Sequence, residues 1–203
     1  MNYDGLLREN ARYYPKAYSQ APLTLSDVES YLNDHQFTDE LKVISPDTQR
    51  TTHYRTVDQP WRGAYDPDCM ENMWASGYSF IIETPYVSDA VKGIVRSIEA
   101  ANHVSCDAHV YMGKANSHSF EPHDDNAHNL IVQCAGITLW RVWTDGYAPT
   151  IDVVLSPGDA IFIPKGTTHQ AQPLSDRLSV SFPFFPGPKT IQRDIRLDWV
   201  DNS

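Results

Sequence analysis

The feature that most constrains the fold of this chain is a series of short β-prone segments that recurs at regular intervals in its second half. They span residues 106–112, 129–134, 137–143, 150–155, 160–163, 169–172 and 178–184. Turn-forming sequences punctuate the series, at Ala135-Gly136, Asp145-Gly146, Pro157-Gly158-Asp159 and Lys165-Gly166. Strands of this length and rhythm predict a mainly β protein, a sandwich or a barrel of the jelly-roll type.

Helical patterns precede these segments. Ser26 and Glu29 have the spacing of a capping box, which predicts a helix over residues 26–34. Ser88 can cap a second helix, because the apolar residues that follow it recur at helical spacing. Residues 79–83 between the two helices have the composition of a strand. We therefore expect a few helices to flank the β core on its N-terminal side.

The remaining N-terminal segments are weakly patterned. Residues 45–77 contain three prolines and little periodicity, which predicts loops and short turns over the mouth of the barrel. Residues 1–23 are polar and rich in Tyr, and we set them apart as an N-terminal extension. With 203 residues the chain fits one domain, which we assign to residues 24–203 with a β core at about 105–185.

Composition excludes several classes of partner. The formal net charge is −10 and the sequence contains no basic run, so binding to nucleic acid is not expected. Cys69, Cys106 and Cys134 are widely spaced without a C-x-x-C pair, as is typical of reduced thiols in a cytoplasmic protein. Residues 1–16 lack the apolar core of a signal peptide, and no apolar run is long enough for a membrane span.

Three side chains in the β region form a candidate metal site. His123 and Asp125 stand at i and i+2, so both would project from one face of an extended strand. His169 would reach them from a later strand. Two histidines and one carboxylate on one face of a metal, with open positions opposite, suit a non-haem Fe(II) oxygenase. An ordinary surface or core role could explain any one of them, but it explains the three together poorly. Asp124 is expected to face solvent.

Five segments of the chain, taken in their sequence order, resemble the core of the JmjC-type cupin oxygenases. The likeness is greatest to the ribosomal-oxygenase branch of that family. They are VYMG at 110–113, SHSFEPHDD at 117–125, LIVQCAGITLWRV at 130–142, PGDAIFIP at 157–164 (reaching on to His169) and LSVSF at 178–182. The likeness covers roughly residues 24–185. It implies a double-stranded β-helix, Fe(II) held by His123, Asp125 and His169, and 2-oxoglutarate and O2 as co-substrates. Members of the family hydroxylate protein or amino-acid side chains.

One departure concerns the anchor for 2-oxoglutarate. Where the family usually carries a basic residue that pairs with the distal carboxylate, this chain has Thr138. Because burying a carboxylate without a cation or several donors is unfavourable, we predict that Arg177 replaces the missing residue. Arg177 and Ser179 form an Arg-x-Ser pair, as in other Fe(II)/2-oxoglutarate enzymes. The competing interpretation makes Arg177 an exposed charge; Arg141 and Lys114 are weaker candidates.

Other co-substrate contacts follow from the resemblance. Asn129 would approach the keto-acid end, while Tyr111 and Ser117 would offer hydroxyls to the distal carboxylate, where Thr138 could also donate a hydrogen bond. Each could equally be an ordinary inward-facing barrel residue.

Four more aromatic and imidazole side chains have structural interpretations. His118 and His128 are expected to line the mouth or to bond to neighbours rather than to bind metal. Trp140 and Trp143 are expected in the core.

The function predicted from these residues is an Fe(II)- and 2-oxoglutarate-dependent oxygenase that hydroxylates an amino-acid, peptide or protein side chain, with succinate and CO2 as co-products. The net charge of −10 favours a substrate with a basic group. A catalytically silent metal-binding cupin and a cupin metalloenzyme that does not use 2-oxoglutarate are the alternatives. Because the sequence ends soon after segment 178–184, we expect no helical dimerisation or winged-helix segment, which leaves the oligomeric state open.

Overall fold

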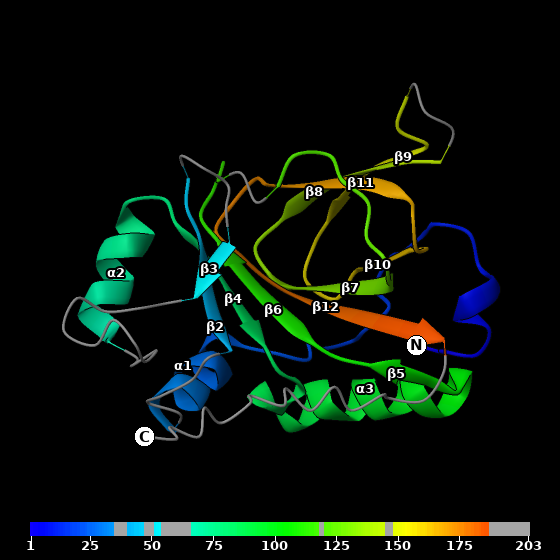
Figure 1. Ribbon diagram of the computed structural model, residues 1–203, viewed down its shortest axis with the longest axis horizontal. Helices are drawn as coiled ribbons and strands as arrows, with labels where there is room; N and C mark the ends of the chain where they lie inside the picture. Colours follow the sequence, from blue (N-terminus) through cyan, green and yellow to red (C-terminus); the bar gives the residue numbers. More distant parts are fainter. Residues whose placement is uncertain (35–39, 47–50, 54–65, 118–119, 145–147, 187–203) are drawn as a thin grey trace, which may run out of the picture.

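A computed structural model describes residues 1–34, 40–46, 51–53, 66–117, 120–144 and 148–186. Two antiparallel sheets face each other, and helices cover the outer side of the larger sheet (Figure 1). This arrangement confirms the predicted mainly β architecture, a double-stranded β-helix with flanking N-terminal helices. In the part of the chain that is described, no helix is long and apolar enough to cross a membrane.

The larger sheet has the strand order β1-β10-β7-β12-β6-β4-β2-β3, with β5 beside β12. Its strands are β1 (Arg12–Tyr14), β2 (Leu41–Ile44), β3 (Thr51–His53), β4 (Ser79–Glu83), β5 (Val104–Cys106), β6 (His109–Gly113), β7 (His128–Ala135), β10 (Ala160–Ile163) and β12 (Arg177–Pro186). The smaller sheet has the order β11-β8-β9, formed by Thr168–Pro173, Thr138–Trp143 and Ile151–Leu155. Every strand predicted in the second half is present, although segment 106–112 is divided between β5 and β6.

The helices are α1 (Leu25–Asp34), α2 (Pro67–Ala75) and α3 (Asp89–Asn102), with short 3-10 turns at Leu6–Arg8 and Pro85–Val87. Helix α3 lies along the outer side of the larger sheet (Figure 1). Its start is capped as predicted, because Ser88 Oγ accepts a hydrogen bond of 3.2 Å from the Val91 N–H.

The structure corrects two expectations for this region. The reciprocal cap of α1 is made by Thr24 and Asp27 rather than by Ser26 and Glu29: Thr24 Oγ1 accepts from the Asp27 N–H, and the Asp27 carboxylate accepts from the Thr24 N–H. The loop predicted over 45–77 is wrong where β3 and α2 form, while residues 47–50 and 54–65 lie outside the described residues.

The α2 helix forms because its cap residue, Asp66, and its first residue, Pro67, suit a helix start. Asp66 accepts a hydrogen bond of 3.1 Å from the Cys69 N–H, and Pro67 occupies the first turn, where its missing N–H has no cost. A proline that looks like a helix breaker in the sequence is thus a helix initiator here.

Apolar side chains fill the outer side of the larger sheet. The largest cluster includes Phe80, Phe162, Phe182 and Phe184, all fully buried together with the apolar faces of α1 and α3. A smaller cluster around Trp140 packs between the two sheets. Since side chains alternate along a strand, the inner face of the larger sheet carries the other set of residues, many of them polar. Cys69, Cys106 and Cys134 are free thiols.

The N-terminal segment is joined to the β core through Asp159. Strand β1 pairs with β10, and the buried Asp159 carboxylate accepts hydrogen bonds from the Tyr13 hydroxyl (2.9 Å), the Lys16 N–H (2.8 Å) and the Ser156 N–H (2.9 Å). The Pro-Gly-Asp turn recognised in the sequence therefore holds residues 12–16 against the larger sheet.

Replacing Asp159 with alanine is expected to lower the free energy of unfolding by about 2–4 kcal/mol, because three donors lose a charged acceptor. The matched variant Tyr13→Phe removes one of these bonds and should lower it by about 1 kcal/mol. Urea denaturation followed by tryptophan fluorescence measures both. Equal small effects would show that the carboxylate does not organise this junction.

Candidate active site

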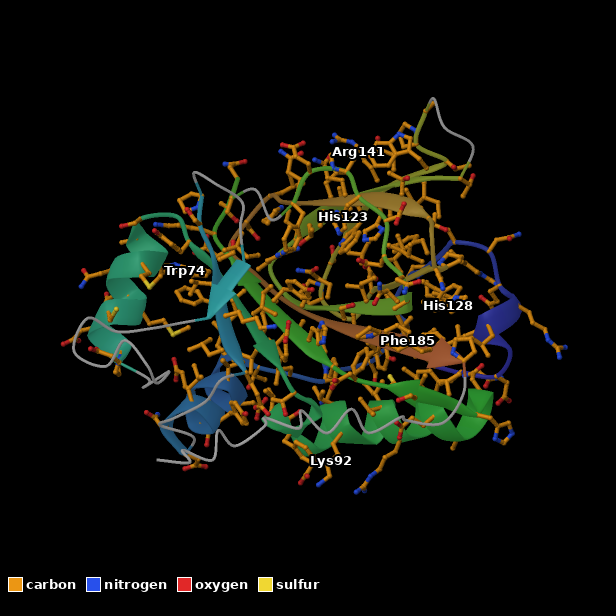
Figure 2. The ribbon with its side chains drawn as sticks, in the orientation of Figure 1. Trp74, Lys92, His123, His128, Arg141 and Phe185 are labelled. Atoms are coloured by element: carbon orange, nitrogen blue, oxygen red, sulfur yellow. The ribbon has the colours of Figure 1, made fainter. Side chains whose placement is uncertain are left out.

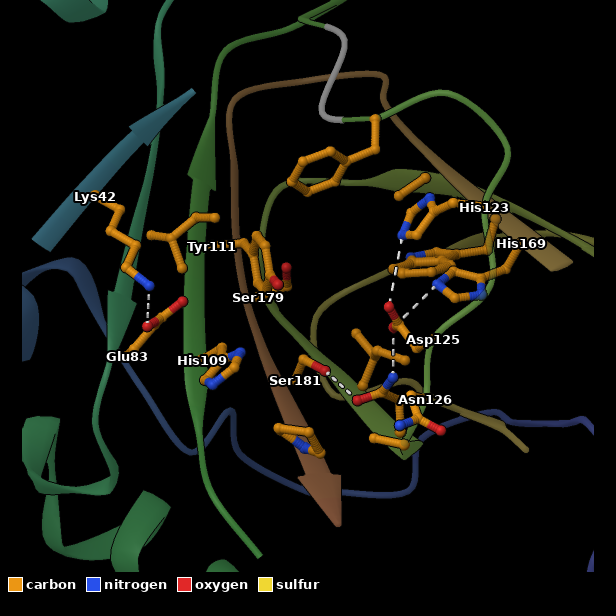
Figure 3. A pocket seen from close by; sticks show the side chains of 18 of the residues that line it. Lys42, Glu83, His109, Tyr111, His123, Asp125, Asn126, His169, Ser179 and Ser181 are labelled. Atoms are coloured by element: carbon orange, nitrogen blue, oxygen red, sulfur yellow. Dashed lines mark hydrogen bonds and ion pairs between the residues drawn. The ribbon is translucent and has the colours of Figure 1, made fainter. Parts of the chain in front are cut away.

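The space between the two sheets contains a cavity of about 550 Å³. Figure 3 shows its lining, with His123, Asp125 and His169 at one end and Lys42 and Glu83 at the other. The inner faces of β12, β6, β4 and β2 form the wall between these ends. The cavity therefore has two chemically distinct ends.

The backbone brings the candidate metal ligands together. His123 and His169 exchange both main-chain hydrogen bonds, at 3.1 Å and 2.8 Å, and so form an antiparallel bridge. Residues paired in this way project their side chains to the same side of the sheet. Their imidazole centroids lie 4.6 Å apart, and Asp125 faces both rings.

The hydrogen bonds of the two imidazoles suit metal binding. Nδ1 of His123 lies 2.8 Å from the Glu121 carbonyl, and Nδ1 of His169 lies 2.9 Å from the Thr167 carbonyl. Because a carbonyl only accepts, each Nδ1 carries the proton and each Nε2 presents a lone pair. Burial lowers the pKa of His169, which also favours its neutral form.

The distances fit one shared ion. Nε2 of His123 lies 4.0 Å from Asp125 Oδ1, and Nε2 of His169 lies 3.6 Å from Asp125 Oδ2. All three ligand atoms lie within 4.8 Å of one another. These separations are too long for hydrogen bonds, but a metal with bonds of about 2.0–2.2 Å could lie between them. Two imidazoles and one carboxylate are ligands that Fe(II) accepts.

Asn129 supports the carboxylate of this site. Its Nδ2 donates a hydrogen bond of 2.7 Å to Asp125 Oδ2, and its Oδ1 accepts one of 3.2 Å from Ser181 Oγ. Asn129, the second residue of strand β7, lines the cavity, and the structure adds this bond to Asp125. The amide thereby fixes one carboxylate oxygen and leaves the other directed at His123.

Replacing Asn129 with alanine is expected to weaken metal binding by about ten- to hundredfold, because the Asp125 carboxylate loses the bond that orients it. Ser181→Ala keeps the amide and should weaken binding by less than about tenfold. Anaerobic titration with Fe(II) or Co(II) measures both affinities. An Asn129→Ala protein that binds metal as tightly as the wild type would exclude this supporting role.

Arg177 supplies a buried cation to the cavity. It is only 4% exposed, so its interpretation as a surface charge is wrong. Its guanidinium carbon lies 5.7 Å from the centroid of the Tyr111 ring, and Ser179 lies opposite Tyr111 in the sheet. Burial lowers the pKa of Arg177 to about 10, which still leaves it cationic at neutral pH. Burial raises the pKa of Tyr111 to about 12, so its hydroxyl remains a donor.

Several other candidates do not line this cavity. Thr138 is fully buried on β8, where its hydroxyl has no hydrogen-bond partner among the described residues. Ser117 accepts a hydrogen bond of 3.4 Å from the Ser79 hydroxyl. Arg141 lies on the outer side of the smaller sheet, 3.7 Å from the Asp152 carboxylate (Figure 2). Lys114 also lies outside the cavity lining. Asp124 is exposed, as expected.

Of the two additional histidines, His128 is described by the structure and does not join the metal site. His128 stacks on Phe162 and Phe184, with ring centroids 6.1 Å and 5.5 Å away, and its Nδ1 accepts a hydrogen bond from the Lys165 N–H. His118 lies outside the described residues. Trp140 is buried, as predicted, and also forms cavity wall by stacking on His169.

Five polar residues of the cavity lining were not predicted from the sequence: Lys42, Glu83, His109, Asn126 and Ser181. Lys42 on β2 forms an ion pair with Glu83 on β4, and His109 lies beside Glu83 on β6. Burial lowers the pKa of His109. The alternating segment Leu41-Lys42-Val43-Ile44 was the available signal, but only the pairing of β2 with β4 places Lys42 at the cavity.

A double-stranded β-helix with two histidines and an aspartate converging inside it is characteristic of the cupin class of metalloproteins. Residues 88–190, just over half of the chain, match the JmjC domain. The chain therefore belongs to the JmjC-domain family, which confirms the resemblance found in the sequence.

Known proteins resemble both the sequence and the fold. The chain is 26% identical over 186 residues to the bifunctional lysine-specific demethylase and histidyl-hydroxylase NO66 of Aedes aegypti, covering 81% of this chain and 28% of that protein. It is 27% identical over 194 residues to ribosomal oxygenase 1 of Danio rerio, covering 85% and 34%. The ribosomal oxygenase YcfD of Escherichia coli, in complex with cobalt and 2-oxoglutarate, aligns with a TM-score of 0.67 and 16% identity, over 90% of this chain and 49% of that one. The chain thus spans about a third of these curated relatives and half of this solved structure.

Proposed function

We propose that this protein is an Fe(II)- and 2-oxoglutarate-dependent oxygenase that hydroxylates a side chain and releases succinate and CO2. The observation that carries the proposal is that the candidate metal ligands and the buried Arg177 line one cavity. An enzyme of this kind needs both a divalent metal and a cation for a dicarboxylate in the same space.

The residues of the chain divide this task. His123, Asp125 and His169 would hold the iron, which when bound supplies the activation of O2 for oxidation of a C–H bond. Arg177 would bind the distal carboxylate of 2-oxoglutarate, and the hydroxyls of Tyr111 and Ser179 would donate hydrogen bonds beside it. The resemblance further assigns Asn129 to the keto-acid end. It also assigns Thr138 and Ser117 to the distal end, but neither of them lines the cavity.

Aromatic side chains pack against the imidazoles at the metal end of the cavity. Trp140 stacks on His169, and the Phe120 ring lies edge-on to His123 with centroids 5.3 Å apart. These contacts hold the imidazole rings in place. The relatives support the proposal through their names, which include a histidyl-hydroxylase and ribosomal oxygenases, and through the YcfD complex with cobalt and 2-oxoglutarate.

Conversion of 2-oxoglutarate to succinate without added substrate tests the proposal directly. Purified protein reconstituted anaerobically with Fe(II) should form succinate when 2-oxoglutarate and O2 are supplied, and should stop when iron is chelated. Iron binding without any succinate would favour the silent metal-binding cupin. Iron-dependent consumption of O2 that ignores 2-oxoglutarate would favour a cupin enzyme of another kind.

A further inference from the structure

The end of the cavity opposite the candidate metal ligands carries an ion pair that the proposed function does not use. Lys42 Nζ and Glu83 Oε2 are in direct contact, and their side chains remain 23% and 32% exposed (Figure 3). Both residues line the cavity. Both charges can therefore still be approached from within it.

The sheet register places this pair away from Arg177. Lys42 lies opposite Ile81 on β4, Ile81 lies opposite Tyr111 on β6, and Tyr111 lies opposite Ser179 on β12. Since neighbouring strands are about 4.8 Å apart, β2 lies about 14 Å from β12 along the sheet. Lys42 is thus a second cation of the cavity, in addition to the one that a single dicarboxylate requires.

The wall between the two ends is polar. Glu83 lies opposite His109, and His109 lies opposite Ser181. These three residues form a lateral row across the sheet, two residues along the strands from the row that contains Lys42. Because laterally paired residues point to the same face of a sheet, all of them face the cavity, whose lining includes each one. A ligand lying between the ion pair and the metal end would meet His109, Tyr111 and Ser181 on the way.

A cation and an anion side by side favour a ligand whose carboxylate faces the cation and whose ammonium group faces the anion. Glu83 disfavours a lone anion and Lys42 a lone cation, whereas a group with adjacent ammonium and carboxylate forms charge-assisted hydrogen bonds to both. A residue inside a polypeptide has neither charge at its α-carbon. An ion pair that bound such a group would therefore distinguish a free amino acid from the same side chain in a protein.

We propose that Lys42 and Glu83 bind the α-carboxylate and α-ammonium of a free amino-acid substrate, whose side chain extends along the cavity toward His123, Asp125 and His169. This inference rests on the proposed function and narrows its substrate class. Long polar side chains fit best, because the intervening wall presents an imidazole and two hydroxyls.

Binding measurements test the inference without depending on turnover. Protein loaded with Co(II) and 2-oxoglutarate is titrated calorimetrically with lysine, arginine, histidine, glutamine and methionine, and with the Nα-acetyl amides of the same five. At least one free amino acid is expected to bind, and its capped form should bind about ten- to hundredfold more weakly, because charge-assisted hydrogen bonds are lost. Equal binding of the free and capped forms would overturn the inference.

Variants then assign the effect to the ion pair. Lys42→Gln and Glu83→Gln should each weaken amino-acid binding by about ten- to hundredfold, while Lys92→Gln, on the outer side of α3 (Figure 2), should change it by no more than about twofold. The double variant Lys42→Gln/Glu83→Gln removes both charges, so it should bind no better than the single variants. Full binding by this double variant would count against recognition of a zwitterion.

The affinity for 2-oxoglutarate separates the two proposals. It should be unchanged in the Lys42 and Glu83 variants, and thermal unfolding verifies that each variant folds. If 2-oxoglutarate binds and is turned over but no free amino acid binds, the inference fails and the proposed function stands. If the wild-type protein with metal does not bind 2-oxoglutarate, the proposed function itself fails.

Discussion

Replacing Asp125 with alanine should lower iron affinity and iron-dependent succinate formation by at least about a hundredfold. Loss of a partner that only orients a ligand typically weakens metal binding ten- to hundredfold, so loss of a ligand should exceed that range. Asp125 also stands between two imidazoles whose Nε2 atoms lie 4.0 Å and 3.6 Å from its oxygens, so its loss leaves no carboxylate between them. Anaerobic iron titration and a succinate assay provide independent measurements.

The neighbouring residue offers a matched control for this experiment. Asp124→Ala removes the same charge from the adjacent position, but Asp124 is exposed and does not line the cavity. Its iron affinity should stay within about twofold of the wild-type value. If the Asp124 and Asp125 variants lost iron equally, the effect would come from the acidic surface. If neither lost iron, these three side chains would not be the metal site.

Most of the β core could be predicted because its residues form local patterns. The strand at 160–163 and the helix capped by Ser88 occur where turn residues, apolar alternation and capping chemistry all favour the same structure. The expectation of loops over residues 45–77 failed where one residue type is compatible with two structures. Pro67 breaks a helix interior but starts α2, because Asp66 in front of it acts as the cap.

The residues of the candidate site likewise fall into those that local sequence patterns predict and those that they do not. His123, Asp125, His169 and Arg177 belong to motifs with recognisable spacing, and the structure brings all four to one cavity. Lys42 and Glu83 belong to short strands far apart in the sequence, and only the lateral pairing of β2, β4 and β6 brings them to that cavity. Pairing depends on the register of whole strands, which no short motif encodes.

Replacing Arg177 with methionine should raise the dissociation constant for 2-oxoglutarate by about 30- to 1000-fold, because the distal carboxylate would lose its buried cationic partner. Methionine preserves most of the apolar volume beside Tyr111, so the barrel should remain folded. Arg177→Lys keeps a charge but not the planar fork of donors, and it should recover only part of the affinity. Anaerobic titration of each metal-loaded protein with 2-oxoglutarate measures the dissociation constants of the variants and of the wild type.

Arg141→Met is the matched control for this substitution. Arg141 has the same side chain on the outer face of the smaller sheet, beside Asp152, and its loss should change 2-oxoglutarate affinity by no more than about twofold. Metal affinity should be unchanged in both proteins, because Arg177 enters the cavity from β12 whereas the candidate metal ligands come from the segment before β7 and from β11. Unaltered 2-oxoglutarate binding by Arg177→Met would move the anchor to another side chain, and Lys42 is then the remaining cation in the described cavity lining.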